Sequence, residues 1–367
     1  MVGAHSPLTR PPPVLWGALS ADVLAEVAGH PVRTPLAVLH GGHALGQRDK
    51  HLLLLAEDGA HRPFAVLKWA RGADAAGLYA EQAALAQVRA LPDALLRAAC
   101  VHSWGPFPLA AGTVLTVDRY VAGDSAYAQL RTSAWPSRLV ARHFRDCAAW
   151  YVRFAAATRR PAQPFSASLF DEAIAAPLQA LTAHFGAAIV PPTALTTLWA
   201  AAQAVCGRPV ARTAEHGDLW PANLLLPRSG HGLYVLDWEH FRPATLPGFD
   251  LLLFATSYAL NLPWRPFGWM PPATALARAY FQPTWLRPPI SAWLEQGCAA
   301  AGLPPALIPL LMPAMLARMA LRYHTYHAAA TDPPSDSLWL AALRAWWTRP
   351  ADNWLEAWAA AASPPQS

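Results

Sequence analysis

The sequence predicts an α+β protein of two lobes: a small antiparallel sheet lobe with one helix, followed by a larger, mainly helical lobe. Short apolar and β-branched runs, set off by Gly, Pro and polar residues, fill positions 31 to 120 and indicate strands. After Gly123 the chain changes to long stretches rich in Ala, Leu and Trp, which indicates helices. The length of 367 residues fits two folding units of roughly 150 residues or more.

In the first lobe, one helix interrupts the predicted strands. It covers Ala76 to Leu91, where Leu78, Leu85 and Val88 recur at helical spacing before Pro92 ends the pattern. A further short strand is expected near Val101. The predicted strands are Pro35 to Leu39, Leu52 to Leu55, Phe64 to Trp69 and Thr113 to Tyr120.

In the second lobe, a small strand region near Leu224 to Leu226 and Leu233 to Leu236 separates long helical stretches. We expect an amino-terminal extension over residues 1–30, a sheet lobe over 31–122, a helical lobe over 123–362 and a frayed tail over 363–367. The predicted helical stretches are Ser137 to Thr158, Thr193 to Cys206, Asp250 to Leu260, Ala306 to His327 and Ser337 to Ala362.

Composition excludes several classes of protein. Apolar residues make up 54% of the chain and charged residues 14%, so disorder for want of a core is not expected. The net charge is +5 with no run of like charges, which argues against a nucleic-acid partner. The apolar stretch Leu303 to Leu321 contains four prolines and Arg318, so we expect a buried helix and no membrane span.

The four cysteines are widely separated, which excludes a Cys-x-x-Cys metal site and a dense disulfide framework. No signal peptide is evident, because the start of the chain has no uninterrupted apolar stretch after a basic region. We therefore expect a cytoplasmic protein with mostly buried, reduced thiols.

The strongest motif lies at His216-Gly217-Asp218, four residues, then Asn223, an apolar triplet, and later Asp237-Trp238-Glu239. A hairpin through these two short strands brings Asp218, Asn223 and Asp237 to one end. Carboxylate and amide oxygens suit Mg²⁺, and phosphoryl transfer needs a further carboxylate beside the attacking hydroxyl. Each residue alone would be read as a turn or cap residue, but the three in this order favour a site.

These residues resemble the catalytic loop and metal-binding segment of the aminoglycoside phosphotransferase and choline kinase family, which has a protein-kinase-like fold. The resemblance implies that Asp218 is catalytic, that Asn223 and Asp237 hold the metal, and that His216 is structural. The segment Pro247 to Leu251 resembles the family's Gly and Asp-Leu element, in which the Asp supports the catalytic loop. Asp250 also reads as an ordinary helix N-cap, and a cap can do both jobs.

The resemblance extends to the sheet lobe. Lys68 lies near the end of a predicted strand, as does the phosphate-contacting lysine of kinase-like folds, and Glu81 follows in the helix as its expected partner. Apart from Lys50, Lys68 is the only lysine in a chain that otherwise uses Arg. A lysine kept against that bias is informative, because a compact ammonium is not replaced by a bulky guanidinium fork. The alternative is a strand-edge lysine in solvent.

Two other nucleotide contacts are suggested by position. The loop around Gly41 and Gly42 could bring backbone N–H groups over phosphates, although a plain hairpin turn explains it equally well. The segment with Asp118 and Tyr120 resembles the lobe-connecting segment whose main chain meets adenine.

The sequence therefore predicts a phosphotransferase that uses ATP and Mg²⁺ and has a small-molecule hydroxyl as acceptor: a sugar, an amino alcohol or an aminoglycoside-like compound. From Asp124 onward there are 18 Arg against 14 Asp plus Glu, which leans away from a polycationic acceptor. Glu215, Glu239 and Glu295 could still form a local acidic pocket.

The alternatives are a catalytically silent nucleotide-binding module and, less favoured, a protein kinase. Only about a dozen residues separate Asp237 from Asp250, too few for a phosphosite-bearing activation loop. Two weaker features stay open. A late helix carries Arg318, Arg322, His324 and His327, which either bind an anion or form a solvated face, and the Trp339 to Trp358 aromatics favour packing.

Overall fold

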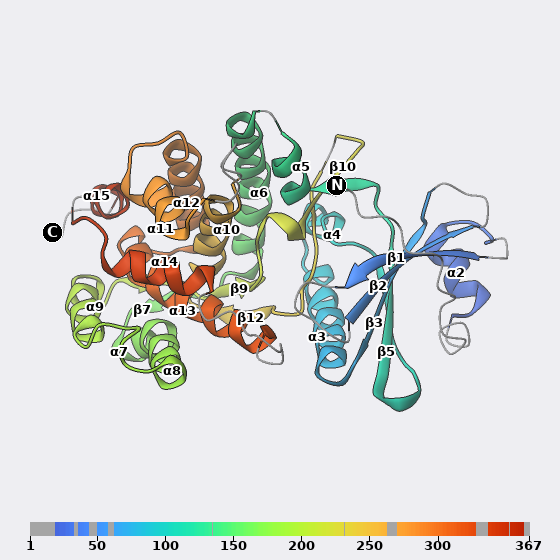
Figure 1. The fold of residues 1–367 in the computed structure, drawn as a ribbon, viewed down its shortest axis with the longest axis horizontal. Helices are drawn as coiled ribbons and strands as arrows, with labels where there is room; N and C mark the ends of the chain where they lie inside the picture. The colour runs from blue at the N-terminus through green and yellow to red at the C-terminus, as the bar shows by residue number, and fades with distance from the viewer. Residues whose placement is uncertain are drawn as a thin grey trace.

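A computed structural model gives the fold of the chain. It describes residues 19–32, 36–43, 50–57, 62–133, 135–230, 232–262, 270–327, 337–351 and 353–362. A sheet of five strands comes first and a mainly helical region follows, so the α+β prediction is confirmed (Figure 1).

The sheet is antiparallel throughout, in the order β1-β2-β3-β5-β4. Its register decides which side chains share a face: Lys50 pairs with Ala70, and Lys68 lies two residues before Ala70 on the same strand. Because side chains alternate along a strand, both lysines lie on one face of the sheet. The strands are β1 (Leu36–His43), β2 (Lys50–Glu57), β3 (Ala65–Arg71), β4 (Ser103–Pro108) and β5 (Thr113–Arg119).

Helices cover both faces of this sheet. Helix α3 (Gly72–Arg89) packs on the lysine-bearing face, where its Leu78 joins Ala70 and Val114 in a small apolar cluster. Helix α2 (Ala21–Ala28) packs on the other face, burying Leu24 and Val27. From the sequence we expected an amino-terminal extension over residues 1–30, without a helix in it. Ser20 instead caps a helix whose C-terminal carbonyls accept from Arg119.

The helical region surrounds three small sheets. Strands β11 (Tyr234–Val235), β10 (Leu224–Pro227) and β6 (Gly123–Ser125) form one, β12 (Arg242–Thr245) and β9 (Thr213–Glu215) form another, and β7 (Gln163–Pro164) pairs with β8 (Pro209–Val210). The helices are α4 (Ala94–Ala98), α5 (Ala126–Thr132), α6 (Pro136–Thr158), α7 (Ala167–Phe170), α8 (Ala176–Phe185), α9 (Ala194–Ala202), α10 (Phe249–Asn261), α11 (Pro272–Leu276), α12 (Arg287–Ala301), α13 (Ile308–His327), α14 (Leu338–Trp347) and α15 (Trp354–Ala361).

One large apolar cluster forms the core of the helical region. Helix α6 packs against α12, and α10 is buried along nearly its whole length. Trp339, Trp346 and Trp354 are buried, so packing explains the late tryptophans. The single stretch expected over Ser337 to Ala362 is two helices, because the chain breaks near Pro350 and Asn353 caps a new helix.

Among the described residues, one helical segment, Pro305–His327, is apolar and long enough to cross a membrane by length and composition. Most of its apolar window (72%) is buried inside the protein, as is typical of a core helix. Three of the four cysteines are buried, whereas Cys206 is exposed.

Candidate active site

The loop after β9 is held by backbone hydrogen bonds to one buried carboxylate. Asp250, in the first turn of α10, accepts from the N–H groups of His216 at 2.6 Å and Gly217 at 2.9 Å. Gly217 has φ +80, and a Cβ there would lie 2.2 Å from the His240 carbonyl oxygen. The loop therefore needs a glycine at this position. Burial and the nearby Glu215 raise the Asp250 pKa to about 8, although the two N–H donors act to lower it.

His216 connects this loop to the following hairpin. Its Nδ1 accepts from the Asp218 N–H at 3.2 Å, and its Nε2 donates to the Leu236 carbonyl at 3.1 Å. Burial lowers the His216 pKa to about 4, so the ring is neutral near pH 7, as this pairing requires.

Asp218 and Asn223 touch each other. The Asn223 side-chain amide donates to the Asp218 carboxylate at 2.8 Å and to its main-chain oxygen at 2.9 Å. Arg322 of α13 donates through one nitrogen to the Gly217 carbonyl at 2.7 Å and to the Asp218 carboxylate at 3.1 Å. Burial raises the Asp218 pKa to about 6, although Arg322 opposes the shift, so the carboxylate remains mostly ionised at pH 7.

Asp237 follows β11 and lies beside Asn223. The Leu236 N–H donates to the Asn223 carbonyl at 2.8 Å, so the hairpin brings Asn223 and Asp237 together. Asp237 has φ +63, a left-handed conformation that non-glycine residues seldom adopt and that is found at functional sites. Burial would raise the Asp237 pKa, but Lys50 and Lys68 outweigh it and the pKa is lowered.

The sheet side contributes a buried cluster of charges. Lys68 Nζ lies 2.6 Å from Glu81 Oε1 of α3 and 2.9 Å from Asp118 Oδ2 of β5. Burial would lower the Lys68 pKa, but these carboxylates and Asp237 raise it, so the ammonium stays charged. The second oxygens, Glu81 Oε2 and Asp118 Oδ1, are buried and accept no hydrogen bond from the described residues.

The positions of the other residues predicted to contact the nucleotide are less easily interpreted. Gly41 and Gly42 belong to strand β1, next to an irregularity in its pairing with β2, and residues 44–49 of the expected loop lie outside the described residues. Asp118 pairs with strands on both sides, and the Tyr120 N–H donates to the Phe64 carbonyl at 2.8 Å. The Tyr120 N–H is therefore already bonded within the protein and is not available to a base.

The donor set fits Mg²⁺. Asp237 is an ionised carboxylate, and the Asn223 side-chain oxygen receives no hydrogen bond from the described residues. Mg²⁺ is commonly bound through one or two protein oxygens, with phosphates and water completing the shell. No group of three or more His, Cys, Asp or Glu side chains that could hold a metal occurs within the described ranges. The two oxygens thus suit a metal that arrives with a phosphate ligand.

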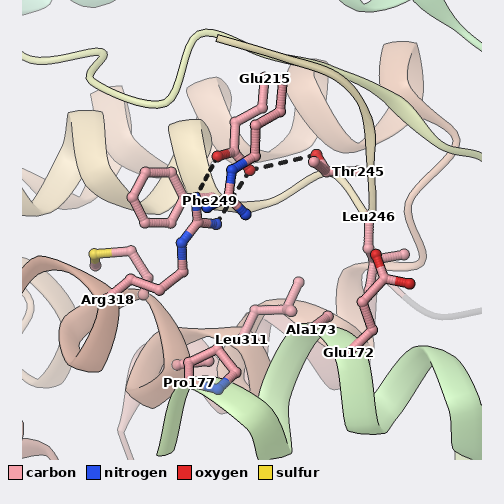
Figure 2. Close-up of a pocket in the computed structure, with 12 residues that line it drawn as sticks. Glu172, Ala173, Pro177, Glu215, Thr245, Leu246, Phe249, Leu311 and Arg318 are labelled. Atoms are coloured by element: carbon pink, nitrogen blue, oxygen red, sulfur yellow. Dashed lines mark hydrogen bonds and ion pairs between the residues drawn. The ribbon is translucent and has the colours of Figure 1, made fainter. Parts of the chain in front are cut away.

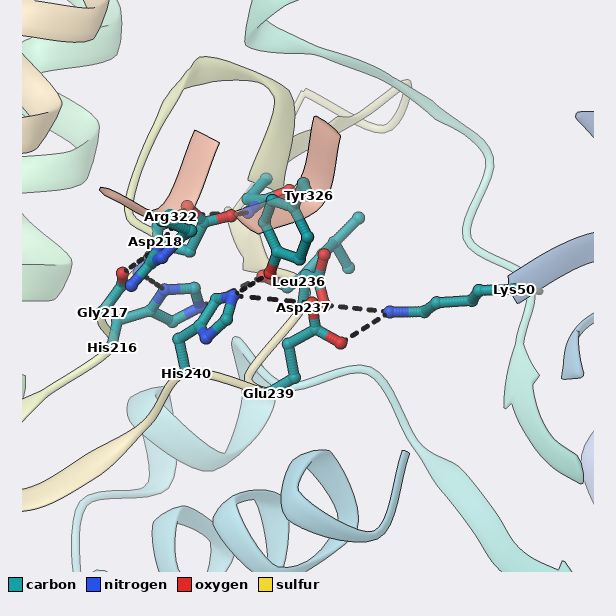
Figure 3. A network of polar contacts seen from close by, with 11 residues as sticks. Lys50, His216, Gly217, Asp218, Leu236, Asp237, Glu239, His240, Arg322 and Tyr326 are labelled. Carbon is teal, nitrogen blue, oxygen red and sulfur yellow. Dashed lines mark hydrogen bonds and ion pairs between the residues drawn. The ribbon is translucent and has the colours of Figure 1, made fainter. Parts of the chain in front are cut away.

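Sequence reasoning missed two cations of this site (Figure 3). Lys50 Nζ lies 3.0 Å from Glu239 Oε2 and 3.5 Å from Asp237 Oδ1, although it comes from β2. The rarity of lysine was a signal for it. From its sequence position, Arg322 is expected only to bind an anion or to lie on a solvated face. Nothing in the sequence pairs it with Asp218, 104 residues away.

A cavity lies beside the loop, among β12, α10, α13 and the turn before α8 (Figure 2). Its carboxylates already have partners. Glu215 accepts two hydrogen bonds from Arg318, whose guanidinium stacks 3.6 Å from the Phe249 ring centroid, and Glu172 pairs with Arg212. Arg242 also lines the cavity. Glu215, Glu239 and Glu295, which the sequence suggested as an acidic pocket, do not form one. Glu239 pairs with Lys50, and Glu295 is exposed on α12.

Comparison with known proteins gives a likeness of structure alone. No protein-family model matches the chain, and no curated protein matches its sequence. The apo form of a thermostable mutant of aminoglycoside phosphotransferase APH(4)-Ia is 15% identical, with 94% of this chain and 100% of that chain covered and a TM-score of 0.50. A ternary complex of that phosphotransferase with ADP and hygromycin B is 16% identical, with coverage of 89% and 98% and a TM-score of 0.50.

The ethanolamine kinase of Plasmodium vivax is 9% identical, with coverage of 94% of this chain and 92% of that chain and a TM-score of 0.51. These alignments span nearly the whole chain at low identity, so they speak to architecture. The protein therefore has the two-lobed, kinase-like fold that this aminoglycoside phosphotransferase and this ethanolamine kinase share.

Proposed function

We propose that the protein is an ATP- and Mg²⁺-dependent kinase that transfers the γ-phosphoryl group to a hydroxyl of a small molecule. The observation that carries the proposal is the meeting of Asp218, Asn223 and Asp237 at one hairpin that faces the buried Lys68–Glu81 pair. Five groups of these types are what phosphoryl transfer requires, and the left-handed conformation of Asp237 is of a kind found at functional sites.

Each residue has a role in this proposal. Lys68, fixed by Glu81, would bind phosphate oxygens, while Asn223 and Asp237 would hold the metal. When bound, the metal neutralises charge on the phosphates. Asp218 accepts a hydrogen bond from the acceptor hydroxyl and orients it, and Asp250 and His216 hold the loop that carries it. Catalysis would be mostly positioning and charge neutralisation.

The charges near Asp218 bear on the acceptor. Arg322 touches the carboxylate itself, and Arg242 lines the neighbouring cavity. The nearby Glu215 is already neutralised by Arg318. A polycationic acceptor would meet repulsion here, so a neutral or anionic hydroxyl compound is favoured over an aminoglycoside.

The test is Mg²⁺-dependent release of ADP across a panel of sugars, amino alcohols, hydroxy acids and aminoglycosides. We expect one acceptor class to give turnover that Asp218→Ala removes. Asp146→Ala, which changes an aspartate on α6 that pairs with Arg145, is the matched control and should keep activity. ATP binding without turnover on any acceptor would favour the silent binding module, and no ATP binding would refute the site.

A further inference from the structure

Both lysines of the chain lie at the candidate active site. The sequence has 28 basic residues, of which Lys50 and Lys68 are the only lysines. Lys50 is buried and Lys68 is partly buried, with side-chain exposures of 3% and 14%, and each ammonium contacts two carboxylates. The sheet register places both on one face, so two ammonium groups point from the sheet into the same acidic cluster.

Stability alone does not explain Lys50. Its partners, Asp237 and Glu239, lie 187 and 189 residues away, so the pair joins the sheet lobe to the helical region. A buried ion pair often stabilises a protein no more than apolar side chains of the same volume, because both charges lose their hydration. A requirement for an ammonium at this point, in a chain that otherwise uses Arg, suggests a ligand.

The position of the Lys50 ammonium indicates which part of a ligand it would contact. The ammonium is 3.0 Å from Glu239 and 3.5 Å from Asp237, so Glu239 is the closer partner of Lys50. The Asp237 carboxylate stays accessible to another ligand. The Glu239 carboxylate is itself wedged against α3, where a Cβ on Gly77 would lie 2.6 Å from its Oε2. Lys50 is thus held beside the proposed metal ligand, where phosphates that share the metal would lie (Figure 3).

We propose that Lys50 is a second phosphate-contacting residue of the nucleotide site, anchored by Glu239 and directed at the terminal phosphates. This inference rests on the proposed kinase function and adds a residue to it. Lys68 and Lys50 would then hold the phosphate chain from one face of the sheet. The opposing possibility is that Lys50 only neutralises Asp237 and competes with the metal for it.

Lysine-directed labelling tests the contact on the intact chain without measuring turnover. The probe is an acyl-phosphate derivative of ATP. The lysine ammonium first loses one proton to solvent, and the free amine then attacks the acyl carbon. An amide forms, the acyl–phosphate bond breaks to release ATP, and the second proton leaves to solvent. Because the chain has two lysines besides its α-amino group, mass spectrometry assigns each adduct directly. We expect adducts on both lysines, with Lys50 protected by ATP and left unprotected by AMP.

Nucleotide affinity, measured by calorimetry, separates the two roles. Lys50→Met should weaken binding of Mg–ATP about tenfold to a hundredfold, the effect of losing one charge-assisted hydrogen bond, and leave adenosine binding unchanged. Lys68→Met is the matched lysine control and should also weaken binding of Mg–ATP. Tighter binding of Mg–ATP to Lys50→Met would mean competition with the metal and would overturn the inference, as would an unchanged affinity.

The labelling result also keeps this inference distinct from the proposed function. An adduct on Lys68 without one on Lys50 would overturn the role of Lys50 and leave the kinase proposal standing. Failure of the probe to label the unmodified protein, together with failure of ATP to bind it, would overturn both.

Discussion

Replacement of Arg322 by glutamine should move the pKa of the carboxylate that we propose orients the acceptor. Asp218 has a pKa of about 6 because burial raises it, while the Arg322 guanidinium at 3.1 Å holds it down. A neighbouring cation typically lowers a carboxyl pKa by about 1–3 units. Without the cation, the Asp218 pKa should rise to about 7 or above, and the ionised fraction at pH 7 should fall from about nine-tenths to half or less.

The assay is the pH dependence of kcat/KM for the acceptor that the panel identifies. The acidic limb of the profile should shift upward by at least one pH unit in Arg322→Gln. Arg322→Lys keeps the positive charge and serves as the control, so its limb should shift much less. A limb that stays in place in Arg322→Gln, or that moves equally in both variants, would show that Arg322 does not control the ionisation of Asp218.

Three further predictions concern the stability of this loop and of the residues next to it. Because the folded-state pKa of Asp218 is raised, the folded chain loses stability as pH rises from about 4 to 6, so Asp218→Asn should stabilise it at pH 7 by up to about 3 kcal/mol in urea unfolding. Gly217→Ala should lower Tm far more than Gly230→Ala: both glycines have positive φ, but a Cβ on Gly230 meets nothing within 4 Å, so the difference measures the clash with His240. Arg318→Met should destabilise by about 3–5 kcal/mol by stranding the buried Glu215, and adding Glu215→Gln should recover part of that loss; equal stability of the single and double variants would contradict this reasoning.

Much of the site could be read from sequence because its parts are local. Asp218, Asn223 and Asp237 sit on one hairpin, and the spacing of turn residues and apolar runs fixes that geometry. The strand with Lys68 and the helix with Glu81 are adjacent in the chain, so their approach was also foreseeable. The fold class and the element order of the sheet lobe followed from the same local patterns.

The remainder depends on contacts that no local pattern encodes. Lys50 and Arg322 reach their carboxylates only after distant elements dock, and charge alone does not choose among many possible partners. Helix α2 was not predicted, although Ser20 at its N-cap and Gly29 after its last turn are local helix signals. Its eight residues are too few to be stable alone, and its stability comes from packing on the sheet. The break at Pro350 was a local signal that the continuous Ala- and Trp-rich composition obscured.

The split between short-range and long-range contacts also has a consequence for how the site forms. The hairpin from Asp218 to Asp237 closes a short loop, whereas the contact between Lys50 and Asp237 spans 187 residues. Closing a longer loop requires a larger loss of chain entropy, and contacts of high sequence separation form slowly. The acceptor half of the site should therefore assemble early within the helical region, and the nucleotide half should be completed last, when the two lobes dock.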